Sequence, residues 1–287
     1  CTHPDGWLAT RKQLIDFKFK MTRATLSILV YVSFYCTGCS EPSKERELEL
    51  NIYAAASLSD VVRQVARNFE AASGIYVTLN FASSGALANQ IIAAPRADVF
   101  LSANKEWMDL LENKALVDAG DRGAFARNSL VVVAAKEYDL SAQEGLTHLC
   151  QGDYKYLAIG APEFVPAGRY AMQWLETKAC PTNGNLWQHV ESKIVRAPDA
   201  KSISNYVLSS KGVIGIVYKT DYIDEVERLK VIYEIPPEET TQIEYSAAIV
   251  SGSDAADAAK AFIDYLQGEA VSYLLSQHGF ILTLSYD

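Results

Sequence analysis

Strand-like and helix-like segments alternate along the chain from residue 48 onward, and this alternation restricts the possible folds more than any other feature. The first helical segment is clear, because Val61, Val65 and Phe69 recur at i, i+4 and i+8 and Gly74 follows. Strands separated by helices pair in parallel, so the pattern predicts an α/β fold with mostly parallel, doubly wound sheets. The first strand-like segments are residues 50–54, 75–81 and 98–102, and helical segments follow at residues 59–73, after Gly85 and after Asn104.

A second series of such segments begins at residue 129 and predicts a second unit with its own sheet. Its strand-like segments are residues 129–134, 156–160, 193–196, 213–218, 229–234 and 243–250, with helices at 168–178 and 199–210 and two more at the end of the chain. Right-handed connections bring the loops that follow parallel strands to one sheet edge, where open α/β sheets bind ligands. Ser57 and Ser84 follow the first two strands and are expected at that edge.

Four turns place small or hydroxyl-bearing residues where a strand or loop runs into a helix. The start of a helix has unpaired N–H groups and the positive end of the helix dipole, so each turn is a potential anion-binding site. One such turn is common in any α/β protein, but four favour a site that holds an oxyanion with neutral donors. The turns are residues 55–59, 82–85, 165–168 and 197–200.

The formal net charge of the 287-residue chain is −9. An acidic balance argues against nucleic acid as a partner, because nucleic-acid binding needs a basic surface. It does not argue against an anion that is held by N–H and O–H dipoles inside a closed cleft.

Residues 21–39 have the features of an export signal. Arg23 is followed by an uncharged run of 13 residues, which is too short to span a bilayer comfortably. The run ends in Thr37-Gly38-Cys39, which resembles a bacterial lipoprotein signal; the alternative is ordinary secretion without lipid. We expect lipidation at Cys39, a tether over residues 40–47, and upstream sequence without structure over residues 1–20.

Removal of residues 1–39 takes away five basic and two acidic residues and changes the formal net charge from −9 to −12. Of the five cysteines, Cys150 and Cys180 are then the pair that stays inside the fold. A cysteine pair in an exported protein favours a disulfide, and the alternative is two free buried thiols.

Patterns that would indicate catalysis or a metal ion are weak. The four histidines are scattered without ligand spacing, so we expect no cation site. Ser84 lies in a turn that could carry a nucleophile, but the sequence indicates no histidine to activate it. Asp98 is interpreted as a structural residue at the entry to a strand, rather than as an ion or hinge contact.

Considered singly, Ser57 and Ser84 are typical helix N-caps and Tyr218 is a typical core tyrosine. Six motifs in a fixed order change that interpretation. They are AAASL at 54–58, FASSG at 81–85, ADVFLSA at 97–103, NSLVVV at 128–133, PEFVPAGRYA at 162–171 and GIVY at 215–218. This series resembles that of the periplasmic molybdate-binding proteins of ABC importers, over about residues 48–283.

The resemblance implies a two-lobed type II periplasmic binding protein with the ligand cleft between the lobes. We expect lobe 1 at residues 48–127 and 246–287 and lobe 2 at residues 128–245, each a mostly parallel, doubly wound sheet flanked by helices. It further implies a monomeric binding protein rather than an enzyme, without a cofactor, that delivers molybdate or tungstate to a membrane permease. Its location would be the periplasm or the outer side of a bacterial membrane, with a lipid anchor.

The resemblance also implies which residues bind the oxyanion. Ser57, Ser84 and Tyr218 would contribute hydroxyls, and Ala167 and Ala200 would contribute backbone N–H groups. The family more often has Val then Arg where this chain has Ala200 and Lys201, but a backbone contact depends little on that change. Molybdenum would thus be held as molybdate, and the smaller sulfate ion should fit poorly.

Three other functions remain open from the sequence. The same fold could bind another oxyanion, such as sulfate or a phosphate-like anion. An effector domain of a transcription regulator shares the fold but would need a DNA-binding segment, whereas this N-terminus carries an export signal. A hydrolase that uses Ser84 would need a base that the sequence does not indicate.

Overall fold

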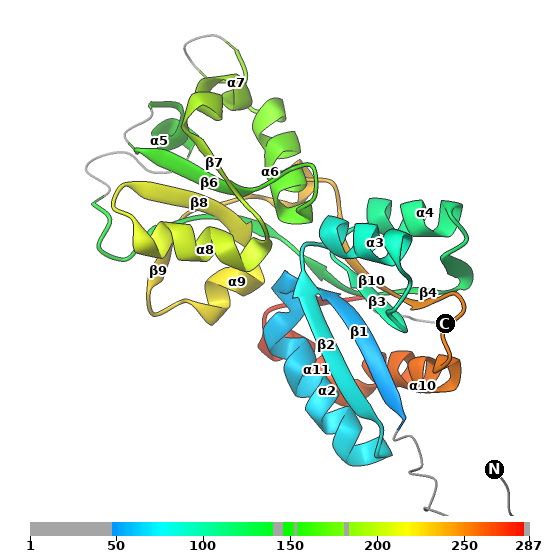
Figure 1. The fold of residues 1–287 in the computed structure, drawn as a ribbon. Coiled ribbons are helices and arrows are strands. Elements are labelled where there is room, and N and C mark those ends of the chain that lie inside the picture. The colour runs from blue at the N-terminus through cyan, green and yellow to red at the C-terminus, as the bar shows by residue number, and fades with distance from the viewer. Residues whose placement is uncertain (1–47, 140–145, 152–153, 181–183, 284–287) are drawn as a thin grey trace, which may run out of the picture. The chain divides into compact units, whose positions relative to one another are not determined.

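The computed structural model describes residues 48–139, 146–151, 154–180 and 184–283. They belong to one compact unit, Leu48–Asp287, which contains two β-sheets (Figure 1). The upstream sequence, the export signal with Cys39 and the tether lie outside the described residues.

The first sheet has six strands and is flanked by helices on both faces. Its strand order is β11 (Ile281–Leu282), β4 (Val117–Asn128), β10 (Ile243–Val250), β3 (Val99–Ser102), β1 (Glu49–Ala55) and β2 (Tyr76–Ala82). Its helices are α2 (Ser59–Ser73), α3 (Ser84–Ala93), α4 (Lys105–Asn113), α10 (Ala256–Leu266) and α11 (Glu269–Gln277), and the 3₁₀ turn η1 (Ala56–Leu58) precedes α2.

The second sheet has five strands. Its order is β7 (Ile194–Ala197), β6 (Tyr156–Gly160), β8 (Val213–Tyr218), β5 (Leu130–Ala135) and β9 (Leu229–Glu234). Its helices are α5 (Leu146–Gln151), α6 (Pro166–Thr177), α7 (Leu186–Val190), α8 (Ala200–Ser209) and α9 (Lys219–Asp224), with short 3₁₀ turns at Glu191–Lys193 and Pro237–Glu239.

Both sheets are mixed, which differs from the expected mostly parallel sheets. β1 pairs in parallel with β2 and β3, and β6 pairs in parallel with β7 and β8. The remaining ladders, which involve β4, β5, β9, β10 and β11, are antiparallel. The predicted parallel arrangement therefore holds among β1, β2 and β3 and among β6, β7 and β8. The strands at which the chain passes between the sheets pair antiparallel instead. β4 of the first sheet leads directly into β5 of the second, and β10 brings the chain back to the first sheet.

This passage between the sheets also corrects the predicted lobe boundaries. Asn128 is the last residue of β4 in the first sheet, and Leu130 begins β5 in the second. The return strand β10 begins at Ile243, so the expected boundary at 245 falls inside a strand of the first sheet. The chain changes sheets at Ser129 and again between Glu234 and Ile243.

Alternating side chains of β1 explain why helices cover both faces of the first sheet. Leu50, Ile52 and Ala54 are fully buried in the core that includes α2, and Tyr53 packs against the core formed by α3 and α4. Figure 1 shows α2, α10 and α11 on one side of this sheet and α3 and α4 on the other.

Strand order decides where the connecting loops lie. β1 stands between β2 and β3, and β6 stands between β7 and β8. Right-handed crossovers to the two sides of a central strand place the helices on opposite faces and leave a crevice at the carboxyl ends of the strands. Each sheet therefore has such a switch point, one after β1 and one after β6.

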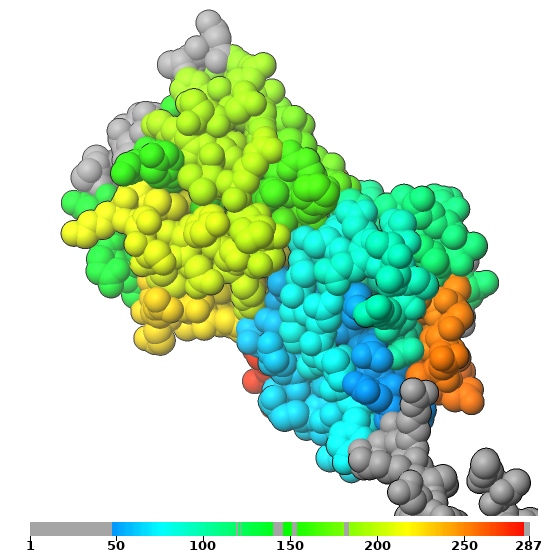
Figure 2. All heavy atoms as spheres, viewed as in Figure 1, coloured from blue at the N-terminus to red at the C-terminus, as the bar shows by residue number. Residues whose placement is uncertain are grey.

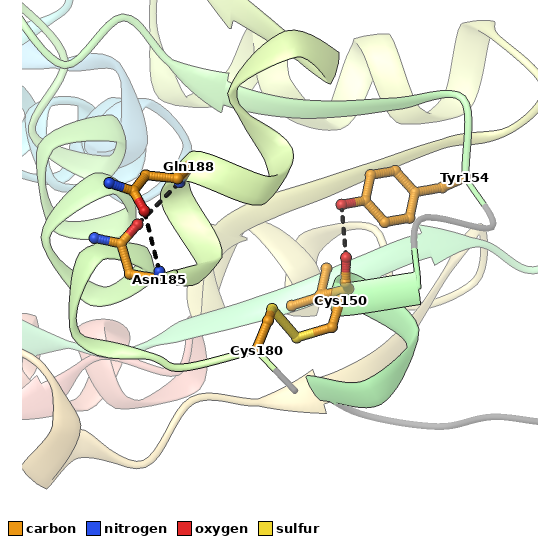
Figure 3. Close-up of a disulfide and its surroundings, with 6 residues drawn as sticks. Cys150, Tyr154, Cys180, Asn185 and Gln188 are labelled. Carbon is orange, nitrogen blue, oxygen red and sulfur yellow. Dashed lines mark hydrogen bonds between the residues drawn. A yellow bond between two sulfur atoms is a disulfide. The ribbon is translucent and has the colours of Figure 1, made fainter. Parts of the chain in front are cut away.

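Cys150 and Cys180 are joined by a disulfide, with their Cα atoms 5.7 Å apart (Figure 3). The bond ties α5 to the segment after α6 across 30 residues of chain. Closing a loop of that length stabilises a fold by about 3–4 kcal/mol in the chain-entropy account. Beside it, the Tyr154 hydroxyl donates to the Leu149 carbonyl at 3.0 Å, and Asn185 and Gln188 cap α7.

Candidate oxyanion-binding site

The five residues expected to bind an oxyanion line one small cavity between the carboxyl ends of the two sheets. The empty space of the cavity is about 180 Å³. The space therefore suits one compact ion. The lining residues are Ala55, Ala56, Ser57, Ser83, Ser84, Ala103, Val165, Pro166, Ala167, Ala200 and Tyr218.

None of these eleven lining residues carries a charge. Ala55 to Ala103 belong to the first sheet and its loops, and Val165 to Tyr218 belong to the second. Figure 2 shows the atoms of these two parts, cyan against green and yellow, meeting along one seam. An anion in the cavity would thus be held by neutral donors from both sheets.

Ser84 is the first residue of α3, and its side chain is fully buried. Its Oγ accepts a hydrogen bond from the Ala103 N–H at 3.0 Å. Because Ala103 supplies a proton to Oγ, the hydroxyl proton of Ser84 is available to donate into the cavity. The N-cap of α3 is Ser83, whose hydroxyl accepts from the Ala86 N–H, so Ser84 is not the helix cap.

Ser57 lies in η1, directly after β1, and is 5% exposed. Its Oγ accepts a hydrogen bond from the Tyr245 hydroxyl at 3.1 Å. The N-cap of this turn is Ala55, so Ser57 is not a cap either. Ser57 thus resembles Ser84: its Oγ accepts a hydrogen bond from a protein group, and its own hydroxyl proton remains available to donate.

Ala167 and Ala200 lie in the first turns of two helices of the second sheet. Ala167 is the second residue of α6, after Pro166, and Ala200 is the first residue of α8. N–H groups of a first helical turn have no acceptor within the helix, and proline at the first position contributes none. The first amide that α6 presents is therefore that of Ala167.

Glycines allow α6 to begin directly against the end of β6. A Cβ atom added at Gly168 would lie 1.8 Å from the carbonyl oxygen of Gly160. No side chain fits at that distance, so the small residue in the Val-Pro-Ala-Gly turn sets how closely the amides of α6 approach the cavity.

Tyr218 ends β8 and is 1% exposed. Its hydroxyl forms no hydrogen bond of good geometry with the described residues, although the Tyr245 hydroxyl lies close enough to affect it. Burial, reinforced by the neighbouring Tyr245 and Tyr170, raises the pKa of Tyr218 well above its usual value, so the hydroxyl keeps its proton. Tyr218 lines the cavity, so its protonated hydroxyl is a candidate donor there.

Two contacts beside the cavity join the parts that carry these donors. The N–H of Gly85 in α3 donates to the carbonyl of Phe164, just before α6, at 3.0 Å. The Arg169 guanidinium lies over the Trp107 ring, 5.4 Å from its centre. A cation over an aromatic face is attracted by the ring quadrupole, so both contacts hold α6 against α3 and α4.

Charged groups gather outside the cavity, around Lys201 of α8. Its ammonium lies 2.7 Å from Asp60 on α2, 3.2 Å from Asp221 and 2.6 Å from Asp224 on α9. Burial alone would lower the pKa of Lys201, but the three carboxylates outweigh it and raise that pKa. Burial raises the pKa of Asp221 to about 6, against the opposing effect of Lys201.

Asp98 is structural, as its position before a strand predicted. Its carboxylate accepts hydrogen bonds from the Asn51 N–H at 2.7 Å and from the Ser253 hydroxyl at 2.6 Å. These bonds tie β3 to β1 and to the turn after β10. Within the described residues, no group of three or more His, Cys, Asp or Glu side chains is placed to hold a metal ion.

Comparison with known proteins places the chain in a family. The sequence profile of the family described as bacterial extracellular solute-binding protein matches residues 50–281. The chain belongs to this family. The prediction that it binds a solute, rather than catalysing a reaction, is thereby confirmed.

Individual relatives agree with this membership. The molybdate-binding protein ModA of Escherichia coli is 34% identical over 82% of this chain and 90% of its own length. A putative ABC transporter substrate-binding lipoprotein, YvgL of Bacillus subtilis, is 29% identical over 92% of this chain and 98% of its own length.

Solved structures share the fold. The periplasmic molybdate-binding protein of Azotobacter vinelandii superposes with a TM-score of 0.72 at 20% identity, over 82% of this chain and all of that chain. The two-lobed α/β fold of periplasmic binding proteins, expected from the sequence, is thus confirmed. Among the described helices, none is both long and apolar enough to cross a bilayer.

Proposed function

We propose that this protein binds molybdate, or the nearly isosteric tungstate, between its two sheets and delivers it to an ABC permease. The observation that carries the proposal is the neutral cavity, which Tyr218 lines with its hydroxyl protonated. Hydroxyls of Ser57, Ser84 and Tyr218 and amides of Ala167 and Ala200 approach it from both sheets. Relatives that are named molybdate-binding proteins support this choice of anion.

The chemistry of the cavity suits a tetrahedral dianion. Such an ion offers several acceptor lone pairs on every side, and five neutral donors can meet them without a counter-ion that would slow release. The space is too small for a sugar or an amino acid in this conformation. Specificity then depends on the size of the cavity and on whether every donor finds an acceptor.

Sulfate and phosphate-like anions are the alternative ligands. Sulfate is smaller, so it would leave at least one donor of the set too far away to bond. A protonated phosphate must direct its own proton at groups that are donors here. Both situations leave a buried polar group unpaired, which costs about 1–3 kcal/mol.

The test is calorimetric titration of the protein with molybdate, tungstate, sulfate and phosphate. We expect tight binding of molybdate and tungstate with similar affinities, and binding of sulfate and phosphate that is weaker by about 5- to 150-fold, from a cost of about 1–3 kcal/mol. Preferential binding of sulfate or phosphate would instead identify the alternative, and no binding of any of the four would contradict the proposal.

Lipid attachment at Cys39 and a monomeric state complete the proposed role. A relative named as a lipoprotein supports the lipid, which would hold the protein at the outer side of the membrane near its permease. Cys39→Ser should release the protein from the membrane fraction or block its processing. Unchanged fractionation and processing would point to ordinary secretion.

A further inference from the structure

A chain of hydrogen bonds leads from the point where the polypeptide crosses between the sheets to the hydroxyl of Ser57. Asn128, at the end of β4, donates through Nδ2 to the Tyr245 hydroxyl at 3.2 Å. Tyr245, on β10, donates in turn to Ser57 Oγ at 3.1 Å. All three residues are buried, with Tyr245 fully enclosed.

The direction of this chain follows from the Asn128 amide. Its Oδ1 accepts from the Ser129 N–H at 2.9 Å, which fixes the orientation of the amide group. Nδ2 therefore faces Tyr245 and the Thr220 hydroxyl, which lies 3.0 Å away. An amide nitrogen has protons and no lone pair to offer, so the Tyr245 oxygen must accept from it.

The next bond in the chain involves the single hydroxyl proton of Tyr245. The Tyr245 oxygen accepts from Asn128 and its hydroxyl donates to Ser57 Oγ, while the Tyr218 hydroxyl is a further neighbour of Tyr245. Ser57 keeps its own hydroxyl proton, and Ser57 lines the cavity. Burial raises the pKa of Tyr245, which keeps the phenol protonated and the chain intact.

We propose that Asn128 and Tyr245 are positioning residues that orient Ser57 as a hydrogen-bond donor toward the bound oxyanion. Neither residue lines the cavity, and both act through Ser57. The inference rests on the proposed function, because it assumes an anion at the cavity. It adds to that function a pair of residues on the two strands, β4 and β10, that carry the chain between the sheets.

The central test is a double-mutant cycle between Tyr245→Phe and Ser57→Ala, with molybdate affinity measured by calorimetry. Without the Tyr245 hydroxyl, Ser57 loses its donor and can rotate away, so Tyr245→Phe should raise the Kd about tenfold or more. In the Ser57→Ala background, the same change should alter the Kd by less than about threefold, because the residue that it orients is gone.

A matched control is Tyr154→Phe, which removes another buried tyrosine hydroxyl with one hydrogen bond, before the amino end of β6, whereas the cavity lies at the carboxyl ends of the strands. It should lower the melting temperature and leave the Kd unchanged. A merely structural role of Tyr245 would give the same tenfold loss in both Ser57 backgrounds, and that additive result would overturn the inference.

A second cycle tests Asn128. Asn128→Asp replaces a donor with a carboxylate of the same shape, which would draw the Tyr245 proton away from Ser57. Any direct repulsion between the carboxylate and the anion is common to both backgrounds, so it cancels in the comparison. The Kd should rise at least threefold more in the wild-type background than in the Tyr245→Phe background, and equal increases would remove Asn128 from the chain.

Failure of the positioning role can be distinguished from failure of the proposed function. If the wild-type protein binds none of the four anions, the proposed function fails. If it binds molybdate and the cycles are additive, molybdate binding stands and the positioning role is wrong.

Discussion

The hydroxyl of Tyr218 separates a ligand contact from a packing role more directly than any other atom of the site. Tyr218→Phe should raise the Kd for molybdate about tenfold or more, because a hydrogen bond to a charged group contributes roughly 1.5–3 kcal/mol. The melting temperature of the ligand-free protein should change little, since the Tyr218 hydroxyl forms no hydrogen bond of good geometry with the described residues. Titration and thermal melts measure both. An unchanged Kd would mean that Tyr218 has only a packing role in the core.

Ser84→Ala should behave differently from Tyr218→Phe. The variant loses a donor to the anion, and it also leaves the Ala103 N–H without its acceptor. Both the affinity and the free energy of unfolding should therefore fall, the latter by about 1–3 kcal/mol in urea titrations. If only stability falls, Ser84 is a structural partner of Ala103 and not a ligand contact.

At this scale, the sequence predicted the residues that follow strands but not those that support them. Ser57, Ser84, Ala167 and Ala200 stand in turns with a local signature, Tyr218 follows from the family resemblance, and the structure brings all five to one cavity. Asn128 opens the NSLVVV motif but precedes no helix, and Tyr245 has no local signature. A lone tyrosine in an alternating strand looks like any core tyrosine, and its partners lie 117 and 188 residues away in the sequence.

At the scale of elements, the contact between α3 and the segment before α6 depends on Gly85. A Cβ atom there would lie 2.7 Å from the carbonyl oxygen of Phe164 and 2.5 Å from the Trp107 ring. Gly85→Ala should therefore hold the two parts slightly apart and raise the Kd for molybdate at least tenfold. Its melting temperature should fall as well, because the Trp107 ring must shift.

Gly74→Ala is the matched control for this prediction. Gly74 ends α2 with φ at 73°, a conformation that costs other residues about 1 kcal/mol, and a Cβ there meets no atom within 4 Å. The control should lose stability and keep its affinity. If the Gly85→Ala variant also keeps its affinity, contact between these two segments is not needed for binding.

Elements with a clear period were predictable, including β5, β9 and β10, but the antiparallel pairing of these strands was not. β1, β6, β8 and α2 lie within a residue or so of their predicted bounds, because each has a regular apolar spacing and a defined end. β4 was missed, since its sequence VDAGDRGAFARN has glycines and charges in place of alternation. Tertiary pairing with β10 and β11 makes it a strand.

At the scale of the whole molecule, the buried carboxyl group of Asp221 gives stability an unusual pH dependence. Its pKa is about 6 in the folded state, against 3.8 ordinarily, so the folded protein retains a proton that the unfolded chain releases between about pH 4 and 6. Stability from this group is therefore fully present below that window and is lost as the pH rises through it.

Asp221→Asn removes this dependence, while Lys201 keeps Asp60 and Asp224 as partners. The free energy of unfolding of the variant relative to the wild type should increase by about 2 kcal/mol between pH 4 and pH 7, from the size of the shift. Urea titrations at several pH values measure it. Burial raises the pKa of Asp60 and Lys201 lowers it, with a net lowering. This contribution to stability is present in both proteins. Parallel curves of the free energy of unfolding against pH for the two proteins would show that Asp221 titrates normally.

Molybdate binding should close the two sheets on each other. The donors come from both sheets, and most of the residues around the cavity are buried, so an ion cannot enter unless the two parts separate. The chain crosses between the sheets at Ser129 and between Glu234 and Ile243, and these crossings can act as a hinge. An ion that contacts both sheets stabilises the closed state through its higher affinity for that state.

Small-angle scattering of the protein should therefore show a smaller radius of gyration after molybdate is added. The variant with both Ser84→Ala and Tyr218→Phe is the control, because it should keep the larger radius at the same molybdate concentration. The Lys201 ion pair with Asp60, which joins α8 to α2, should form in the same step, so Asp60→Asn should weaken binding and reduce closure. An unchanged radius in a protein that calorimetry shows to be saturated would mean that the anion binds without bridging the two sheets.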